Sequence, residues 1–137
     1  MRVANATCGA IGSGLVALVS VGVGDSEDDA RLLAETIVGL RIFGDDAGLM
    51  NRSIREANGA VLLVSQFTLH GDARKGRRPS FVAAAGEPLA RPLYELTGRL
   101  IERAGVHAEY GQFGADMEVE LVNDGPVTIL LDTKKTF

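Results

Sequence analysis

Three uncharged polar side chains follow a run of four aliphatic residues, at the point where a buried strand would end. The residues 61–64 ("VLLV") lead directly into Ser65, Gln66 and, two positions later, Thr68. In an extended strand alternate side chains share a face, so Gln66 and Thr68 are expected to point the same way. A buried hydroxyl or amide without a partner costs on the order of 1–3 kcal/mol. This polar pair therefore needs either nearby loop backbone groups or a ligand, and the pattern leaves both interpretations open.

A basic loop follows the same strand. Its cationic residues are Arg74, Lys75, Arg77 and Arg78. A charge run in a loop is usually a solvated turn, and the alternative is a clamp for phosphate groups. The chain as a whole has a net charge of −4 and a pI near 5.1. These values exclude a protein coated in positive charge, so any contact with RNA must be local.

A second candidate segment is "LVNDGPVTILL" (121–131), which has Gly125-Pro126 at the turn of an expected hairpin. Proline donates no hydrogen bond to a neighbouring strand, and an X-Pro bond adopts the cis form at a cost of only ~1 kcal/mol. A cis bond at this position would turn consecutive carbonyl oxygens outward as a rigid pair of acceptors. A plain hairpin turn is the alternative, because "NDGP" also forms one well.

Other kinds of site have little support. Cys8 is the single cysteine, and no Cys/His cluster has the spacing of zinc ligands, so we expect no disulfide, no metal, no cofactor and a reduced, cytoplasmic setting. His70 and His107 lie in no recognisable hydrolase motif. The stretch "GVGDSEDD" lacks the third glycine of a dinucleotide fingerprint, and its four acids would repel a pyrophosphate. No apolar run approaches the length of a membrane span, and no signal peptide is visible.

The elements that must position these residues form one domain, residues 1–137. We expect strands over 14–24 and 59–69, and amphipathic helices over 25–43 and 87–104. Ser26 followed by Asp29 gives the first helix a capping-box-like start. Alternating patterns near the end of the chain, in "VHAEYGQF", "DMEVELVN" and "VTILLD", predict two or three antiparallel strands. The fold class is α/β or α+β, with a mostly antiparallel sheet and two packed helices.

Four segments together resemble the D-aminoacyl-tRNA deacylase family, over roughly residues 9–133. They are "LRIF" (40–43), "SQFTL" (65–69), "KGRRPSF" (75–81) and "FGADMEVELVNDGPVT" (113–128). The resemblance implies a half-barrel fold and a homodimeric, metal-independent hydrolase with its active site at the subunit interface. Such an enzyme cleaves the ester that joins a D-amino acid, or glycine, to the 3′ end of tRNA, as chiral proofreading in translation.

The resemblance also implies residue roles. The backbone N–H of Phe67, helped by Gln66, would stabilise the developing oxyanion, while the terminal ribose 2′-hydroxyl of the tRNA assists the hydrolysis. Thr68 would orient the ester or a water, in the same catalytic segment as Ser65. Without a neighbouring base a threonine is a poor nucleophile, so covalent catalysis is not favoured.

For substrate binding, the resemblance implies that Gly125 and Pro126 reach into the partner's pocket as a main-chain filter that rejects L-amino acids. The other implied substrate and tRNA contacts fall into three groups: Asn123 and Thr128 holding the turn rigid, Phe113 and Met117 lining the pocket for the terminal adenosine, and Lys75, Arg77 and Arg78 on acceptor-end phosphates. For Phe113 and Met117, core packing is the alternative.

The chain departs from the family at its start. Relatives open with a strand and hairpin before the segment that matches residues 9–23, and only "MRVANATC" precedes that segment here. We therefore expect a short or missing N-terminal strand, a less stable dimer, and Arg2 as a poor substitute for an arginine that braces the turn in relatives. Two alternatives stay open: a non-catalytic tRNA-binding module that lost activity through its short N-terminus, and a sibling enzyme that removes a small L-amino acid from tRNA.

Overall fold

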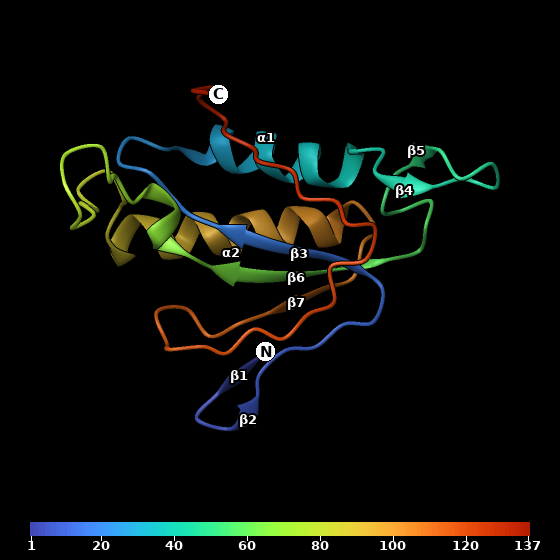
Figure 1. Cartoon of the computed structure of the whole chain (residues 1–137), viewed down its shortest axis with the longest axis horizontal. Helices are drawn as coiled ribbons and strands as arrows, with labels where there is room; N and C mark the ends of the chain where they lie inside the picture. The colour runs from blue at the N-terminus through green and yellow to red at the C-terminus, as the bar shows by residue number, and fades with distance from the viewer.

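The Val-rich run and the "VLLV" run form the centre of the molecule. The computed structural model describes all residues, 1–137. Its central sheet has the order β3-β6-β7, with β3 at Gly14–Val19, β6 at Ala60–Ser65 and β7 at Ala108–Tyr110. Both strand pairs are parallel, so all three strands run in the same direction (Figure 1). The residues that follow β3 and β6 therefore meet at one edge of the sheet.

Two helices connect these parallel strands, because each parallel pair needs a crossover. α1 (Glu27–Gly39) lies between β3 and β6 in the sequence, and α2 (Glu87–Arg103) lies between β6 and β7. At the start of α1 the Asp29 carboxylate accepts a hydrogen bond from the Ser26 N–H at 2.9 Å, as the capping pattern predicts. The two helices pack against each other on the same side of the sheet (Figure 1).

The core has two parts because β6 is buried on both faces. Val61 and Leu63 point to the helix side and pack with Tyr94 and Ile101. The alternate residues of β6 point to the other side and pack in a second cluster with Met1. The buried Tyr94 hydroxyl donates to the Leu63 carbonyl at 2.9 Å, which ties α2 to the central strand.

The predicted class, two helices packed on a sheet, is confirmed, but the predicted strand direction is wrong for the central sheet. Apart from isolated bridges, antiparallel pairing occurs in two small sheets: β1 (Arg2–Val3) with β2 (Ala6–Thr7), and β4 (Phe43–Gly44) with β5 (Met50–Arg52). The strands do not close into a barrel. Residue patterns show which strands are buried, whereas the helix inserted between each pair decides their direction.

Of the strands predicted near the end of the chain, the one in "VHAEYGQF" forms as β7 but pairs parallel to β6, and those in "DMEVELVN" and "VTILLD" do not form. After β7, the one strand-like contact is a bridge between Glu118 and Arg2 of β1. The following segment, residues 119–131, carries exposed apolar side chains at Leu121, Val122, Ile129, Leu130 and Leu131. These residues belong to no strand and pair with no sheet of the chain. We call residues 119–131 the unpaired segment.

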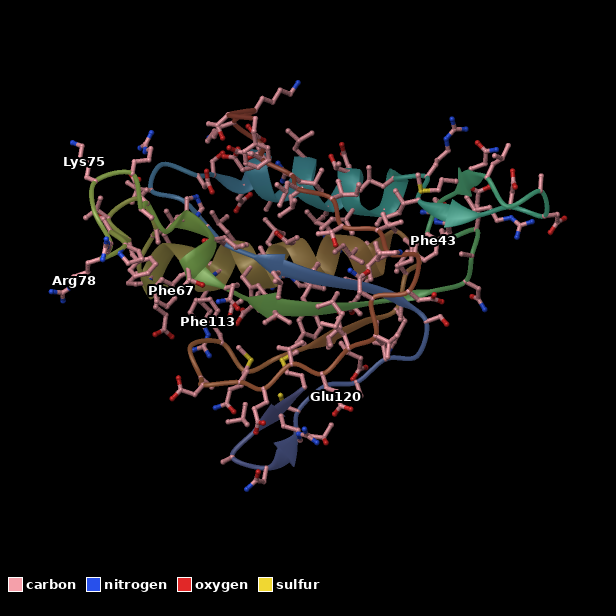
Figure 2. The ribbon with its side chains drawn as sticks, viewed as in Figure 1. Phe43, Phe67, Lys75, Arg78, Phe113 and Glu120 are labelled. Atoms are coloured by element: carbon pink, nitrogen blue, oxygen red, sulfur yellow. The ribbon has the colours of Figure 1, made fainter.

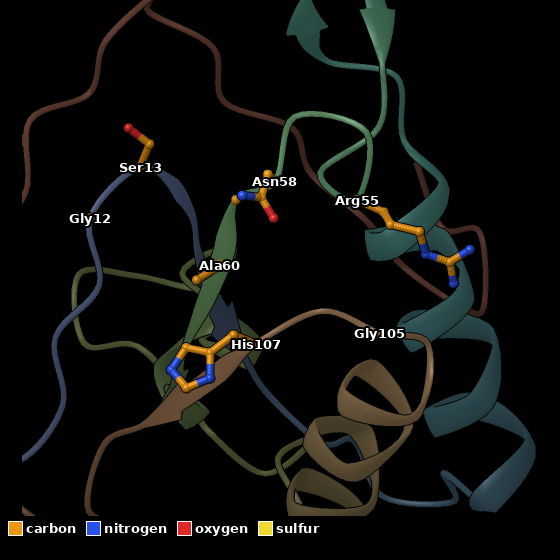
Figure 3. Close-up of a pocket in the computed structure, with 8 residues that line it drawn as sticks. Gly12, Ser13, Arg55, Asn58, Ala60, Gly105 and His107 are labelled. Atoms are coloured by element: carbon orange, nitrogen blue, oxygen red, sulfur yellow. The ribbon is translucent and has the colours of Figure 1, made fainter.

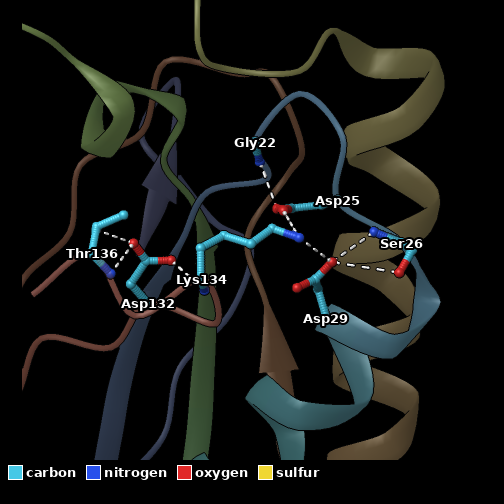
Figure 4. A network of polar contacts seen from close by, with 7 residues as sticks. All are labelled: Gly22, Asp25, Ser26, Asp29, Asp132, Lys134 and Thr136. Atoms are coloured by element: carbon cyan, nitrogen blue, oxygen red, sulfur yellow. Dashed lines mark hydrogen bonds and ion pairs between the residues drawn. The ribbon is translucent and has the colours of Figure 1, made fainter.

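The last residues return to the start of α1 (Figure 4). Lys134 Nζ lies 3.0 Å from an oxygen of Asp29 and 3.6 Å from an oxygen of Asp25. Asp29 also accepts the Ser26 N–H, and these contacts lower its pKa from 3.8 to about 2. Asp132 accepts the Lys134 N–H at 2.9 Å and shapes the turn. The ion pairs fix the C-terminal tail beside the loop that follows β3.

Candidate functional site

β6 ends at Ser65, and the polar residues that follow form a 3-10 turn, η1 (Phe67–His70). The predicted strand over 59–69 is therefore too long, and strand alternation is the wrong reason for Gln66 and Thr68 to be neighbours. The last sheet bond runs from the Gln66 N–H to the Val19 carbonyl at 2.8 Å, and the chain then turns. The turn still brings the predicted pair together, since the Gln66 amide donates to the Thr68 hydroxyl oxygen at 2.5 Å.

Main-chain donors are available at the start of η1. The first N–H groups of a helical turn have no carbonyl partner within that turn. Phe67 and Thr68 occupy these first positions, and the Phe67 side chain is 58% exposed. The Phe67 ring packs edge-on against Phe81 at a centroid distance of 5.3 Å. An oxyanion brought to this surface would therefore meet backbone N–H groups beside the Gln66 amide.

The basic loop lies directly beyond η1. Asp72 and Ser80 pair through two backbone hydrogen bonds and close the loop. Arg74 binds Asp72 at 2.7 Å, which lowers the pKa of that carboxyl to about 2. The other three cations, Lys75, Arg77 and Arg78, are exposed and make no ion pair with an acid. Lys75 and Arg78 project away from the body of the protein (Figure 2).

Phe113 and Met117 pack in different clusters. Phe113 is half-buried, 5.7 Å from the Tyr94 ring, with the Arg91 guanidinium 5.4 Å from its ring centre. It lines a hollow of about 350 Å³ with Arg91, Tyr94, Gln112 and neighbouring residues. Met117 packs on the other face of the sheet with the Met1 cluster. Figure 2 labels Phe113 and Phe67, and their aromatic contacts differ: Phe113 packs with Tyr94, whereas Phe67 packs with Phe81.

The Gly125-Pro126 turn does not reach the Gln66 site of its own chain. Its peptide bond is trans, so the cis form considered from the sequence is not present. The turn forms with a trans bond, and Gly125 in it has φ +136°, a backbone conformation that glycine adopts readily. Across the turn, the Asn123 amide donates a hydrogen bond to the Thr128 hydroxyl at 3.2 Å. In Figure 1 this part of the chain lies toward the edge where β3 and β6 begin, opposite η1.

A polar hollow of about 370 Å³ lies at that opposite edge (Figure 3). Arg55, Asn58 and His107 line it together with glycine and serine backbone. Arg55 already donates to the Ala104 carbonyl, and His107 pairs with Glu109 at 2.7 Å. Because both basic groups have partners, this hollow is a weaker candidate than the η1 surface.

Sequence reasoning missed one polar contact at the η1 surface. His70, which belongs to no sequence motif, lies 2.5 Å from the hydroxyl of Ser20, the residue that follows β3. The parallel pairing of β3 with β6 brings them together, and that pairing was not predicted. No group of three or more His, Cys, Asp or Glu side chains is arranged to hold a metal ion. None of the helices could cross a membrane.

Comparison with known proteins identifies the family of this chain. Residues 1–132 match the family model described as D-Tyr-tRNA(Tyr) deacylase. The chain belongs to that family. Two relatives named D-aminoacyl-tRNA deacylase are similar to it. The protein from Halalkalibacterium halodurans is 55% identical over 93% of this chain and 88% of its own length. The one from Anaeromyxobacter dehalogenans is 54% identical over 100% of this chain and 92% of its own length.

Solved structures support the deacylase-family fold. One, described as c-Myc DNA Unwinding Element Binding Protein, superposes with a TM-score of 0.89 at 31% identity, over 96% of this chain and 90% of its own. Another, described as a probable eukaryotic D-amino acid tRNA deacylase, has a TM-score of 0.59 at 16% identity, over 74% of this chain and 75% of its own. The second likeness concerns the fold alone.

The N-terminal residues of this deacylase-family chain form the short β1–β2 hairpin. Arg2 exchanges two backbone hydrogen bonds of 2.8 Å with Glu118, and its side chain lies 3.5 Å from Glu120. The Arg2 side chain therefore pairs with the strand-like stretch before the Gly125-Pro126 turn and not with the turn itself.

Proposed function

We propose that this protein hydrolyses the ester of D-aminoacyl-tRNA, releasing free tRNA and the D-amino acid, as a proofreading step in translation. The observation that carries the proposal is the turn after β6, where Gln66 binds Thr68 beside the first N–H groups of η1. Relatives more than half identical to this chain bear the name of that activity. We place the activity in the cytoplasm, where tRNA is aminoacylated and used.

The proposed chemistry uses main-chain donors. When water adds to the acyl carbon, the Phe67 N–H and the Gln66 amide stabilise the oxyanion, a type of contribution worth roughly 3–4 kcal/mol per donor. The carbon–oxygen bond to the ribose then breaks, the acyl carbon keeps the new hydroxyl, and the ribose oxygen takes a proton. The terminal 2′-hydroxyl of the tRNA assists the attack.

Thr68 orients the ester or the water in this scheme. The only side-chain hydrogen bond to its hydroxyl comes from the Gln66 amide, which is not a base. Without a base the hydroxyl stays protonated and is a weak nucleophile. Because its oxygen accepts from Gln66, its own hydrogen remains available to donate to the substrate. Ser65 ends β6 and fixes where the turn begins.

We propose that the active unit is a homodimer in which Gly125-Pro126 of one subunit enters the Gln66 site of the other. Within one chain the turn and the site lie at opposite edges of the sheet (Figure 1). The unpaired segment that carries the turn exposes apolar side chains, with Val122 90% and Leu130 73% exposed. A second copy would cover this surface and pair its backbone groups. In that arrangement the turn's carbonyl oxygens hold the α-amino group and exclude an L side chain.

Phe113 and Met117 are proposed to line the pocket for the terminal adenosine. Phe113 is the better supported of the two, because its ring borders the hollow beside Arg91. Stacking of a base on an aromatic ring is worth roughly 1–3 kcal/mol. The Asn123–Thr128 hydrogen bond spans the Gly125-Pro126 turn and would hold it rigid.

Replacing Arg77 and Arg78 together by alanine is expected to weaken tRNA binding and to reduce its salt dependence. Each exposed cation that contacts a phosphate adds close to one unit to the slope of log K against log salt, so the slope should fall by roughly 1–2. Filter binding at several salt concentrations measures this. The matched control is Arg99→Ala with Arg103→Ala, two exposed arginines on α2 that make no ion pair. Equal slopes for the two double variants would remove the basic loop from the proposed interface.

The first test of the function is single-turnover deacylation of D-Tyr-tRNA and L-Tyr-tRNA by the purified chain. We expect hydrolysis of the D-ester, slow or no hydrolysis of the L-ester, and a loss of roughly 100-fold in the Gln66→Ala variant. Preference for an L-ester would favour the sibling enzyme that edits L-amino acids. Binding of tRNA without hydrolysis of either ester would favour the non-catalytic module.

A further inference from the structure

Val19, the last residue of β3, and Ser20, which follows it, both contact the turn that carries Gln66, Phe67 and Thr68. The Val19 carbonyl accepts the Gln66 N–H at 2.8 Å. The next residue, Ser20, has its hydroxyl 3.4 Å from the Phe67 carbonyl and 2.5 Å from Nδ1 of His70. Phe67 and His70 are the first and last residues of η1. The Ser20 hydroxyl therefore bridges both ends of the turn that carries the proposed oxyanion donor and Thr68.

The hydrogen bonds of Ser20 have a defined direction when both are made. A serine hydroxyl has one hydrogen to donate, and a carbonyl can only accept. To donate to the Phe67 carbonyl, Ser20 must accept from Nδ1–H of His70. The Phe67 carbonyl belongs to the rigid, planar peptide that also carries the Thr68 N–H. Fixing that carbonyl therefore fixes the peptide plane between Phe67 and Thr68.

His70 is itself held in place by its surroundings. Its ring lies against Gly22, where an added Cβ would approach Nε2 to 3.0 Å. Asp25 is close to the same point and binds both the Gly22 N–H, at 2.7 Å, and Lys134. The pKa of the Asp132 carboxyl is lowered mainly by the Thr136 hydroxyl and backbone N–H groups, with a smaller contribution from His70. The charged groups around His70 are thus two acids and one lysine, from the loop after β3 and the C-terminal tail.

We propose that Ser20 and His70 are positioning residues for deacylation, which hold the Phe67–Thr68 peptide, and with it the flanking Phe67 N–H and Thr68 hydroxyl, through the bridge from Nδ1 to the Phe67 carbonyl. This inference rests on the proposed function and adds to it. His70 acts through Ser20, since no hydrogen bond joins it to Thr68 or Gln66. The alternative role for His70 is that of a general base acting on the Ser20 hydroxyl. The variants below distinguish a positioning role from a base.

The test compares Ser20→Ala, His70→Phe and His70→Asn with the wild-type chain in single-turnover hydrolysis of D-Tyr-tRNA. The asparagine amide can donate a hydrogen bond from near the position of Nδ1 but cannot act as a base. Phenylalanine fills a similar space and forms no hydrogen bond. We expect Ser20→Ala and His70→Phe to lower the rate constant roughly 5- to 30-fold, the range for one lost hydrogen bond, with tRNA affinity unchanged. His70→Asn should stay within about 3-fold of the wild type, because it keeps the bond.

Three results would overturn the inference. The first is wild-type rates in both Ser20→Ala and His70→Phe. The second is a loss in His70→Asn as large as in His70→Phe, which would mark His70 as a base or as simple packing. The third is a loss that appears in tRNA affinity alone. Should His70→Phe fold poorly in thermal unfolding, Ser20→Ala and His70→Asn still give opposite expected results.

A spectroscopic readout keeps this test separate from that of the function. The amide resonance of Thr68 in a ¹H–¹⁵N spectrum should shift from its wild-type position in Ser20→Ala. In His70→Asn, which keeps the hydrogen bond, it should stay close to the wild-type position. An inactive wild-type chain with this pattern would refute the proposed function and leave the positioning contact standing. An active wild type whose variants show unchanged rates and resonances would refute the positioning role alone.

Discussion

Two inactive variants, refolded together in equal amounts, are expected to recover roughly a quarter of the wild-type activity, because half of the dimers then hold one intact site of two. One variant carries Gln66→Ala and Thr68→Ala, and the other carries Gly125→Val. In a mixed dimer, the intact turn of the first chain would enter the intact Gln66 site of the second. This result follows only if the turn works across the subunit interface.

Gly125→Val is suited to disabling the turn without touching the catalytic surface. Gly125 has φ +136°, a conformation that a β-branched residue strongly avoids. A Cβ there would also lie 3.1 Å from the Val127 nitrogen and 3.2 Å from the Val127 side chain. The turn must therefore change shape, and we expect D-Tyr-tRNA hydrolysis by this variant alone to fall roughly 100-fold.

Single-turnover hydrolysis of D-Tyr-tRNA measures the recovery, with each variant refolded alone as the control. No recovery from dimers shown to contain both chains would mean that the turn does not serve the partner's site. The ratio of L-ester to D-ester hydrolysis gives a second comparison, which should rise in Gly125→Val alone and return toward the wild-type value in the mixture.

Val122→Glu is expected to give a folded monomer that has lost at least about 100-fold in activity. Val122 is 90% exposed in the single chain, so glutamate should change the stability of the subunit by no more than ~0.5 kcal/mol. At a subunit interface the same carboxylate would be buried without a partner, which costs several kcal/mol. Loss of the dimer would also separate the Gly125-Pro126 turn from the site that it serves.

Light scattering across a dilution series, together with D-Tyr-tRNA hydrolysis on the same samples, checks this expectation. The matched control is Leu49→Glu, an apolar side chain that is 61% exposed in the loop between β4 and β5. An active monomeric Val122→Glu protein would contradict both the dimer and the filter acting across it. The same series for the wild type tests the prediction of a weak dimer, which a dimer persisting at submicromolar concentration would contradict.

Local signals in the sequence predicted the helices and the polar pair well. Ser26 and Asp29 mark the start of α1, and Gln66 does contact Thr68. These features depend on neighbours within a few residues, which periodicity and capping rules describe. The predicted pairing succeeded even though its stated reason, a continuous strand, was wrong, because the 3-10 turn also brings residues two positions apart together.

Features that depend on distant partners were not predicted. The parallel direction of β3 and β6 depends on how α1 packs, and the contact of Ser20 with His70 exists only because those strands align. The strands expected at 116–123 and 127–132 have the right alternation, yet a strand also needs an edge to pair with. A single chain's sequence does not state whether that edge belongs to the same molecule.

The order of strands in the central sheet also determines the order in which parts of the chain can fold. β3 and β6 pair although Gly14 and Ala60 are roughly 46 residues apart, and β6 then pairs with β7 across a similar span, so both contacts carry a large loop-closure cost. During synthesis β3 must wait for β6, whereas the unpaired segment leaves the ribosome after all three strands of the central sheet. The apolar surface of that segment therefore becomes exposed when the rest of the subunit can already be folded. Recruitment of a second copy would then be a bimolecular step whose speed depends on how much of the protein the cell makes.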